Sequence, residues 1–152
     1  MASVRANALF RELGYSAATF KIDNSTITYD NTMTNGCGLQ TYGKAVTLSA
    51  NATVALVDDG QIVLGRLMRV NIDNFATVQV HGIMILPKGT AGVTFGKKVV
   101  GSQLAAVKGY VRDFVNATLA DVALARGIAL DGSVTAQIGA TASIASAAIW
   151  ID

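Results

Sequence analysis

The sequence predicts a mostly β protein that folds as a compact β-barrel or β-sandwich. Short runs of alternating apolar and polar residues recur along its 152 residues, separated by Gly, Asp and Asn. Side chains of a strand point alternately to opposite faces, so this period near two is typical of β-strands. Only 14% of the residues are charged and Glu12 is the single glutamate, which disfavours a bundle of charged helices.

The clearest strands lie in the middle of the chain. Residues 61–72 and 75–86 both alternate, and Asp73 and Asn74 between them are typical of a hairpin turn. Pro87 ends the second run because proline has no N–H to donate to a neighbouring strand. Further strands are predicted at residues 19–22, 25–29, 46–48, 54–57, 93–95, 98–100, 121–130, 134–138 and 149–151.

One segment has two interpretations. Leu104, Val107 and Val111 have partly helical spacing within residues 103–119, whereas Gly109 and the β-branched residues favour short strands.

The first 43 residues differ from the rest, and we expect an extended, largely irregular arm over 1–43 and a β-rich domain over 44–152. Residues 4–13 suit one short helix, and residues 30–43 are rich in Asn and Gly without periodicity. Ordering a backbone residue costs about 1–2 kcal/mol, so such an arm must lie on its own domain or on a neighbouring subunit. Its isolated apolar side chains are the predicted partner contacts. They are Leu9, Phe10, Tyr15, Phe20, Ile22 and Tyr29.

Composition excludes several classes of partner. The net charge is +2 and Lys and Arg do not cluster, which argues against nucleic-acid binding. No run of about 18–20 apolar residues could span a membrane, and no apolar signal-peptide segment is found at the N-terminus. The lone Cys37 has no intramolecular disulfide partner and is expected to be reduced.

Residues that could perform catalysis are sparse. His81 is the single histidine and falls within an alternating strand, so we expect it to face solvent or an interface. Cys37 lies among glycines without an activating neighbour. We therefore expect no enzyme activity, no cofactor and no small-molecule substrate.

Other motifs are expected to be structural. Asp58 and Asp59 precede a glycine, as in many tight turns, and metal binding is the weaker alternative. Residues 89–96 are rich in glycine but lack the Lys-Ser/Thr ending of a phosphate-binding loop. Lys97 and Lys98 suit a solvated strand edge or, alternatively, a contact with an acidic partner.

A pattern of apolar strands, internal glycines and an Asp-Gly turn runs from residue 43 to residue 130. Its segments are GKAVTL, TVALVDDG, IVLGRL, ATVQVHG, VTFGKKVV and ARGIAL, at residues 43–48, 53–60, 62–67, 76–82, 93–100 and 125–130. This pattern resembles the capsid decoration (cement) proteins of tailed double-stranded DNA bacteriophages. The first 40 residues and the small-residue stretch at 139–148 depart from it.

The resemblance implies a virion protein, made in the host cytoplasm, on the outer surface of the capsid. Such a protein forms a homotrimer and bridges subunits of the major capsid protein, without catalysis or a cofactor. Another β-structured phage component, of a tail or fibre, is the alternative. A barrel that binds glycans is disfavoured, because Trp150 is the single tryptophan and the tyrosines are dispersed.

Overall fold

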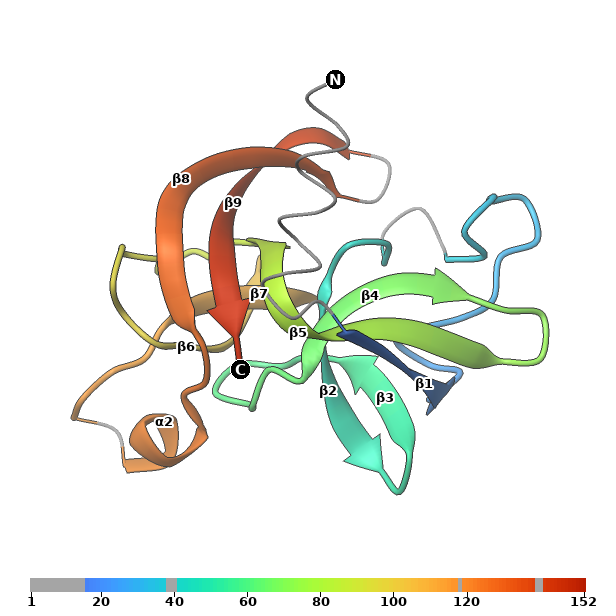
Figure 1. Ribbon diagram of the computed structural model, residues 1–152, viewed down its shortest axis with the longest axis horizontal. Helices are drawn as coiled ribbons and strands as arrows, with labels where there is room; N and C mark the ends of the chain where they lie inside the picture. Colours follow the sequence, from blue (N-terminus) through green and yellow to red (C-terminus); the bar gives the residue numbers. More distant parts are fainter. Residues whose placement is uncertain (1–15, 38–40, 118, 139–140) are drawn as a thin grey trace.

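The computed structural model describes residues 16–37, 41–117, 119–138 and 141–152 of the chain (Figure 1). Within these residues it confirms the mostly β fold, with nine strands and one short helix. The elements are β1 (Ser16–Ile22), β2 (Ala45–Ala50), β3 (Thr53–Leu56), β4 (Gly65–Val70), β5 (Phe75–Pro87), β6 (Val99–Leu104), β7 (Val107–Asp113), α2 (Leu119–Leu124), β8 (Ile128–Ile138) and β9 (Thr141–Ile151).

The first five strands form a closed barrel, on the right of Figure 1. They follow the order β1-β3-β2-β4-β5, and pairing of β1 with β5 closes the circle. β1 runs parallel to β3 and antiparallel to β5. Closure leaves these strands without free edges where they pair. The barrel core consists of Ile22, Ile27, Cys37, Val46, Val54, Leu56, Leu67, Val70, Ala76 and Val78.

The hairpin of β4 and β5 is the best predicted part of the fold. Asp73 and Asn74 form its turn, with Asn74 in the left-handed region at φ 62°. Along β5 the alternation is real: Ala76 and Val78 are fully buried, and the strand ends at Pro87 as expected.

β5 continues beyond the barrel and joins two cores. It is 13 residues long, and its second half pairs with β9 instead of β1 and β4. The change occurs at Gly82, whose φ of 98° suits glycine. The buried Gln79 spans this point by donating from Nε2 to the Ile83 carbonyl oxygen at 2.9 Å.

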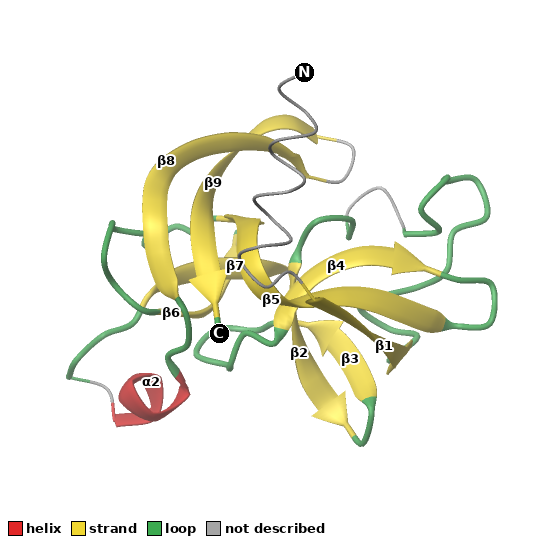
Figure 2. Cartoon of the chain, in the orientation of Figure 1, coloured by secondary structure: helices red, strands yellow, loops and turns green. Residues whose placement is uncertain are grey.

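The second core lies under the β8–β9 hairpin, on the left of Figure 2, and β6 and β7 contribute to it. Its buried members are Ala45, Val57, Val63, Met84, Leu86, Val93, Val99, Val111, Ala129, Ala147, Ile149 and Ile151. Because β5 supplies side chains to both cores, the two packed regions form one continuous structure.

The outer edge of β8 is partly covered by the segment before β6. Gly96 N donates to the Ala129 carbonyl oxygen at 2.8 Å, and Ala129 N donates to that of Lys97 at 2.9 Å. The expected strand at 93–95 is therefore wrong, and this segment instead shields an edge that could pair with another chain.

The predicted boundary at residue 43 is wrong for the described residues that precede it. β1 is a strand of the barrel, and Ile22, Ile27 and Cys37 are buried in the barrel core. The reason is that β1 is needed between β3 and β5 to close the barrel. Residues 1–15, with the expected helix at 4–13, lie outside the described residues.

Three other predictions are corrected or decided. Residues 121–130 are not one strand, since α2 occupies Leu119–Leu124 and β8 begins at Ile128. Residues 25–29 are not a strand: the chain bends at 24–27, where the Asp23 carboxylate accepts hydrogen bonds from residues 25–27, and Tyr29 forms only an isolated bridge with Cys37. Within 103–119, β6 and β7 meet at a turn, which favours the strand interpretation.

Because β5 contributes to both cores, we predict that the two cores unfold together. The chain supplies one probe of unfolding for each core. Cys37 lies in the barrel core, and Trp150 lies in β9 of the second region. In a urea titration, alkylation of the Cys37 thiol and Trp150 fluorescence should give the same midpoint, because losing β5 from one core removes it from the other. A thiol that reacts at clearly lower urea than the fluorescence change would contradict this coupling.

Candidate interaction surface

The outer face of β5, β9 and β8 carries an exposed apolar row. Trp150 pairs directly with Ile83 on one side and with Ile128 on the other. Directly paired residues project from the same face of a sheet, so these three side chains lie together. Trp150 remains 43% exposed and Ile128 48% exposed.

The opposite face of β5, β9 and β8 explains why Trp150 and Ile128 are exposed. The next row, Met84, Ile149 and Ala129, is buried in the second core. Alternation therefore places one row of residues in the core and the other on the surface.

A hollow of about 250 Å³ adjoins the apolar row. Its lining residues are Lys98, Ala125, Arg126, Gly127, Ile128, Trp150 and Asp152. The Arg126 guanidinium donates to the carbonyl oxygens of Asp152 at 2.6 Å and Leu64 at 3.5 Å. These bonds fix the end of β9 beside the segment that precedes β4.

The short helix α2 has its apolar residues outside. Its Asp121 is only 2% exposed, whereas Leu119 is 85% exposed and Val122 49% exposed. A helix on a globular protein normally turns its apolar face inward and its charged residues to solvent. In α2 this arrangement is reversed, so the helix presents an apolar surface.

Ion pairs hold the helix in this orientation. Arg112 on β7 donates from Nη1 to Asp121 Oδ2 at 2.6 Å and from Nε to Asp59 Oδ1 at 2.8 Å. Asp121 Oδ2 also accepts from Val115 N at 3.0 Å. The hydrogen bond from Arg112 holds the pKa of the Asp121 carboxyl below its usual value. It likewise raises the pKa of Arg112, so both groups stay charged at neutral pH.

The predicted turn at Asp58 and Asp59 is correct in position but has a larger role. Asp58 Oδ2 accepts from Lys108 Nζ at 2.6 Å, and this bond lowers the pKa of Asp58. Asp58 also accepts from Gln103. Through Asp59 and Arg112, the turn is connected to α2. The pattern of two acids before a glycine contained no sign of these partners.

A buried lysine lies between the two cores. Lys44, just before β2, is 3% exposed, and its Nζ lies 5.0 Å from the centre of the Tyr110 ring. Gly109 leaves room for it, since a Cβ there would lie 2.8 Å from two carbon atoms of Lys44. Within the described residues Lys44 forms no ion pair, and burial lowers its pKa.

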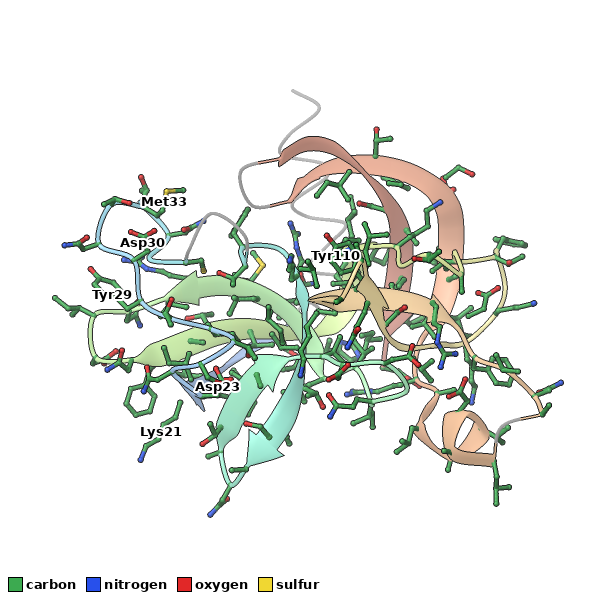
Figure 3. The ribbon with its side chains drawn as sticks, turned by 180° about the vertical axis from the view of Figure 1, so that it is seen from behind. Lys21, Asp23, Tyr29, Asp30, Met33 and Tyr110 are labelled. Carbon is green, nitrogen blue, oxygen red and sulfur yellow. The ribbon has the colours of Figure 1, made fainter. Side chains whose placement is uncertain are left out.

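The residues predicted to contact a partner differ in how far the structure buries them, and some lie outside the described residues. Ile22 is buried in the barrel core and cannot contact a partner, so that assignment is wrong. Phe20 and Tyr29 are half-buried against the same core. Figure 3 shows Tyr29 at one end of the barrel, far from Tyr110. Leu9, Phe10 and Tyr15 lie outside the described residues.

The structure describes both residues considered for catalysis, Cys37 and His81. Cys37 is fully buried, and burial raises the pKa of its thiol to about 11. His81 is half-buried on β5, where it pairs with Ser16 of β1. Lys97, which was expected at a solvated strand edge or at a contact with an acidic partner, forms an ion pair with Asp113 at 3.6 Å.

Among the residues that the structure describes, no three His, Cys, Asp or Glu side chains are grouped so that they could hold a metal ion. The same residues contain no helix with the length and apolar character needed to cross a membrane.

Comparison with known proteins adds no relative. No protein-family model matches the chain, and no curated protein matches its sequence significantly.

Replacing Arg112 tests the ion cluster. Arg112→Met should lower the free energy of unfolding by about 3–5 kcal/mol, because it leaves the buried Asp121 carboxylate without its partner. The double variant Arg112→Met/Asp121→Leu should recover most of the loss in urea titrations. Lys97→Met, which breaks a pair whose lysine is half exposed, should cost less than about 1 kcal/mol.

The same ion cluster should make the free energy of unfolding depend on pH in the acidic range. The pKa of Asp121 is lower in the folded chain than its ordinary 3.8. The stabilising contribution of Asp121 is therefore complete above pH 3.8. It is lost as pH falls through the lower pKa that Asp121 has in the folded chain. The wild type should lose more stability below about pH 4 than the double variant. Equal losses in both proteins would contradict this role.

Lys44 should make stability depend on pH in the alkaline range. Because its folded pKa is lowered, the unfolded chain binds more protons between that pKa and 10.5. Stability should therefore rise with pH from that lowered pKa up to 10.5. Lys44→Met should remove this rise and increase the urea midpoint at neutral pH. Lys21→Met, at an exposed lysine, serves as the control and should change neither.

Proposed function

We propose that this chain is a structural virion protein that decorates and stabilises the head of a tailed double-stranded DNA bacteriophage. It binds as a homotrimer to the outer surface of the capsid, after synthesis in the host cytoplasm, and bridges neighbouring subunits of the major capsid protein. The proposal begins from the resemblance of residues 43–130 to the decoration family.

The exposed apolar surface of α2 and the Ile83–Trp150–Ile128 row is the observation that carries this proposal. Exposed apolar patches of this kind mark sites where other proteins bind, and aromatic residues dominate such contacts. The surface stands on paired strands and on a helix held by ion pairs, so it is rigid before binding. This rigidity reduces the conformational entropy lost on association.

Stabilisation of a head then follows from mass action. A protein that binds the assembled shell and not its separated subunits shifts the equilibrium towards the shell. Three linked copies bind more tightly than one, since the second and third contacts become intramolecular. No chemical step is required in this mechanism.

Binding to heads tests the proposal directly. Purified protein should co-sediment with mature heads that were assembled without it, and should raise the temperature at which those heads release DNA. It should not bind isolated capsid subunits. Failure to bind heads would overturn the proposal, and binding to purified tails instead would establish the tail alternative.

Truncation then tests the predicted arm. A variant lacking residues 1–14 removes Leu9 and Phe10 but keeps β1, whereas deletion to residue 43 would remove a barrel strand. The shorter variant should fold and bind heads at least about tenfold more weakly. Unchanged occupancy of heads would remove the arm from the mechanism and leave the decoration function intact.

A further inference from the structure

We propose that Asn35 and Gly36 form a deamidation site, which the folded barrel protects and which a chain kept unfolded modifies irreversibly. The inference concerns covalent chemistry within this chain and does not depend on the proposed decoration of heads. It is carried by the hydrogen bonds and the packing of the loop at residues 29–37, which lies at one end of the barrel.

The sequence contains one asparagine that glycine follows, at Asn35. Asparagine is a chemically labile residue, and deamidation is fastest when the next residue is glycine, because glycine has no side chain that hinders its own nitrogen. Figure 3 labels Tyr29, Asp30 and Met33 of the loop that contains this pair. The loop therefore carries the most labile peptide bond that the sequence offers.

The reaction is an attack within the backbone. The Gly36 nitrogen bonds to Asn35 Cγ, the Cγ–Nδ2 bond breaks, and Nδ2 leaves as ammonia with the proton that Gly36 N has lost. The product is a cyclic imide. Water then opens the imide at either carbonyl carbon and gives aspartate or isoaspartate. In isoaspartate the backbone runs through the side chain and is one carbon atom longer.

Hydrogen bonds of the folded loop oppose this attack. Gly36 N donates to the Met33 carbonyl oxygen at 2.9 Å, which keeps the attacking nitrogen protonated. Asn35 Oδ1 accepts from Cys37 N at 3.0 Å, and the Asn35 carbonyl oxygen accepts from Val70 N at 2.9 Å. These two bonds hold the side chain and the backbone of Asn35 in place. Gly36 is buried as well, so the site of attack is shielded from water.

The fold requires both residues of the labile pair. Gly36 has φ 65°, and a Cβ at this position would lie 1.8 Å from the Val70 carbonyl oxygen. Only glycine fits there. At residue 35, the bond to Cys37 N requires a short side chain with an acceptor oxygen, which asparagine, aspartate and serine provide. The lability of the pair thus follows from the way in which this loop closes against β4.

Isoaspartate at residue 35 is incompatible with the barrel. The carbonyl group that accepts from Val70 N would become a free carboxylate, and Gly36 would be attached one atom further along. Gly36 has no space to move, because the Val70 carbonyl oxygen and the Tyr29 ring lie against it. Cys37 follows directly and is fully buried in the barrel core. The longer backbone therefore displaces Cys37 from a closely packed core.

The site makes covalent damage depend on folding. Asn35 gains its bond from Val70 N only when β4 has formed beside the loop. A folded chain is protected, whereas a chain that stays unfolded accumulates isoaspartate and loses the ability to close its barrel. Deamidation thus removes slowly folding chains from the population that can still fold.

Isoaspartate formation in native and denaturing solvent tests the protection. The full chain is kept with a thiol reductant at one mildly alkaline pH, either in guanidinium chloride or in sodium chloride of equal concentration. Peptide mass spectrometry and labelling by isoaspartyl methyltransferase measure isoaspartate at residue 35. The reaction should be at least about tenfold slower in sodium chloride, because the folded chain reacts only when the loop opens. Equal rates in the two solvents would overturn the proposal.

Refolding after storage in guanidinium chloride tests the consequence. On dilution, the fraction of wild-type chains that again protect Cys37 from alkylation should fall as isoaspartate at residue 35 accumulates. Asn35→Ser keeps an acceptor oxygen and has no amide to lose, so it should refold fully after the same storage. The other labile positions are identical in the two proteins, so the comparison isolates residue 35.

A second variant guards against a folding defect in the first. Asn35→Asp has the side chain of the other hydrolysis product and forms the imide more slowly, so it should bury Cys37 and lose refolding more slowly than the wild type. Wild-type chains that contain isoaspartate at residue 35 and still bury Cys37 would overturn the proposal. Loss of refolding at the wild-type rate in both variants would overturn it as well.

Discussion

Much of the molecule depends on the continuity of β5 through two hydrophobic cores. Ala76 and Val78 fill the barrel, and Met84 and Leu86 fill the second core. Between them, Gly82 allows the strand to change partners, and Gln79 donates to the Ile83 carbonyl oxygen across the change. Side-chain alternation along this strand also determines which residues of its neighbours are exposed, including Trp150. The candidate interaction surface is therefore a direct geometric consequence of how β5 is buried.

The exposed helix has a different physical basis from the strands. In α2, buried charge interactions replace the apolar packing that usually fixes a helix. Asp121 and Arg112 gain little net stability over an apolar pair of equal volume, because both are removed from water. What the pair does supply is orientation, since the bonds of Arg112 to Asp59 and Asp121 have defined directions. A surface oriented in this way remains available for binding instead of collapsing onto the chain's own core.

Local patterns predicted the elements whose stability is itself local. Alternation and Pro87 located β5, and Asp73 and Asn74 located its turn. The errors concern interactions between distant residues. The pairing of β1 with β5 leaves no periodic signal, so the strand was assigned to an arm. Residues 121–130 were assigned to one strand, whereas the contact of Asp121 with Arg112 positions a helix there. The row containing Trp150 was missed because small residues occupy both faces of β9 and hide which face is buried.

The arrangement of strands around β5 also has a consequence for folding during synthesis. β1 precedes its partner β5 by more than fifty positions in the printed sequence, and β9 follows it by a similar separation. The barrel can therefore close only after β5 has left the ribosome, and the second core only after β9 has. Until then β5 emerges with apolar side chains that lack their partners. Such long-range pairing is slow compared with local structure formation. The nascent chain thus passes through an aggregation-prone stage, in which chaperones that shelter exposed strands would have their largest effect.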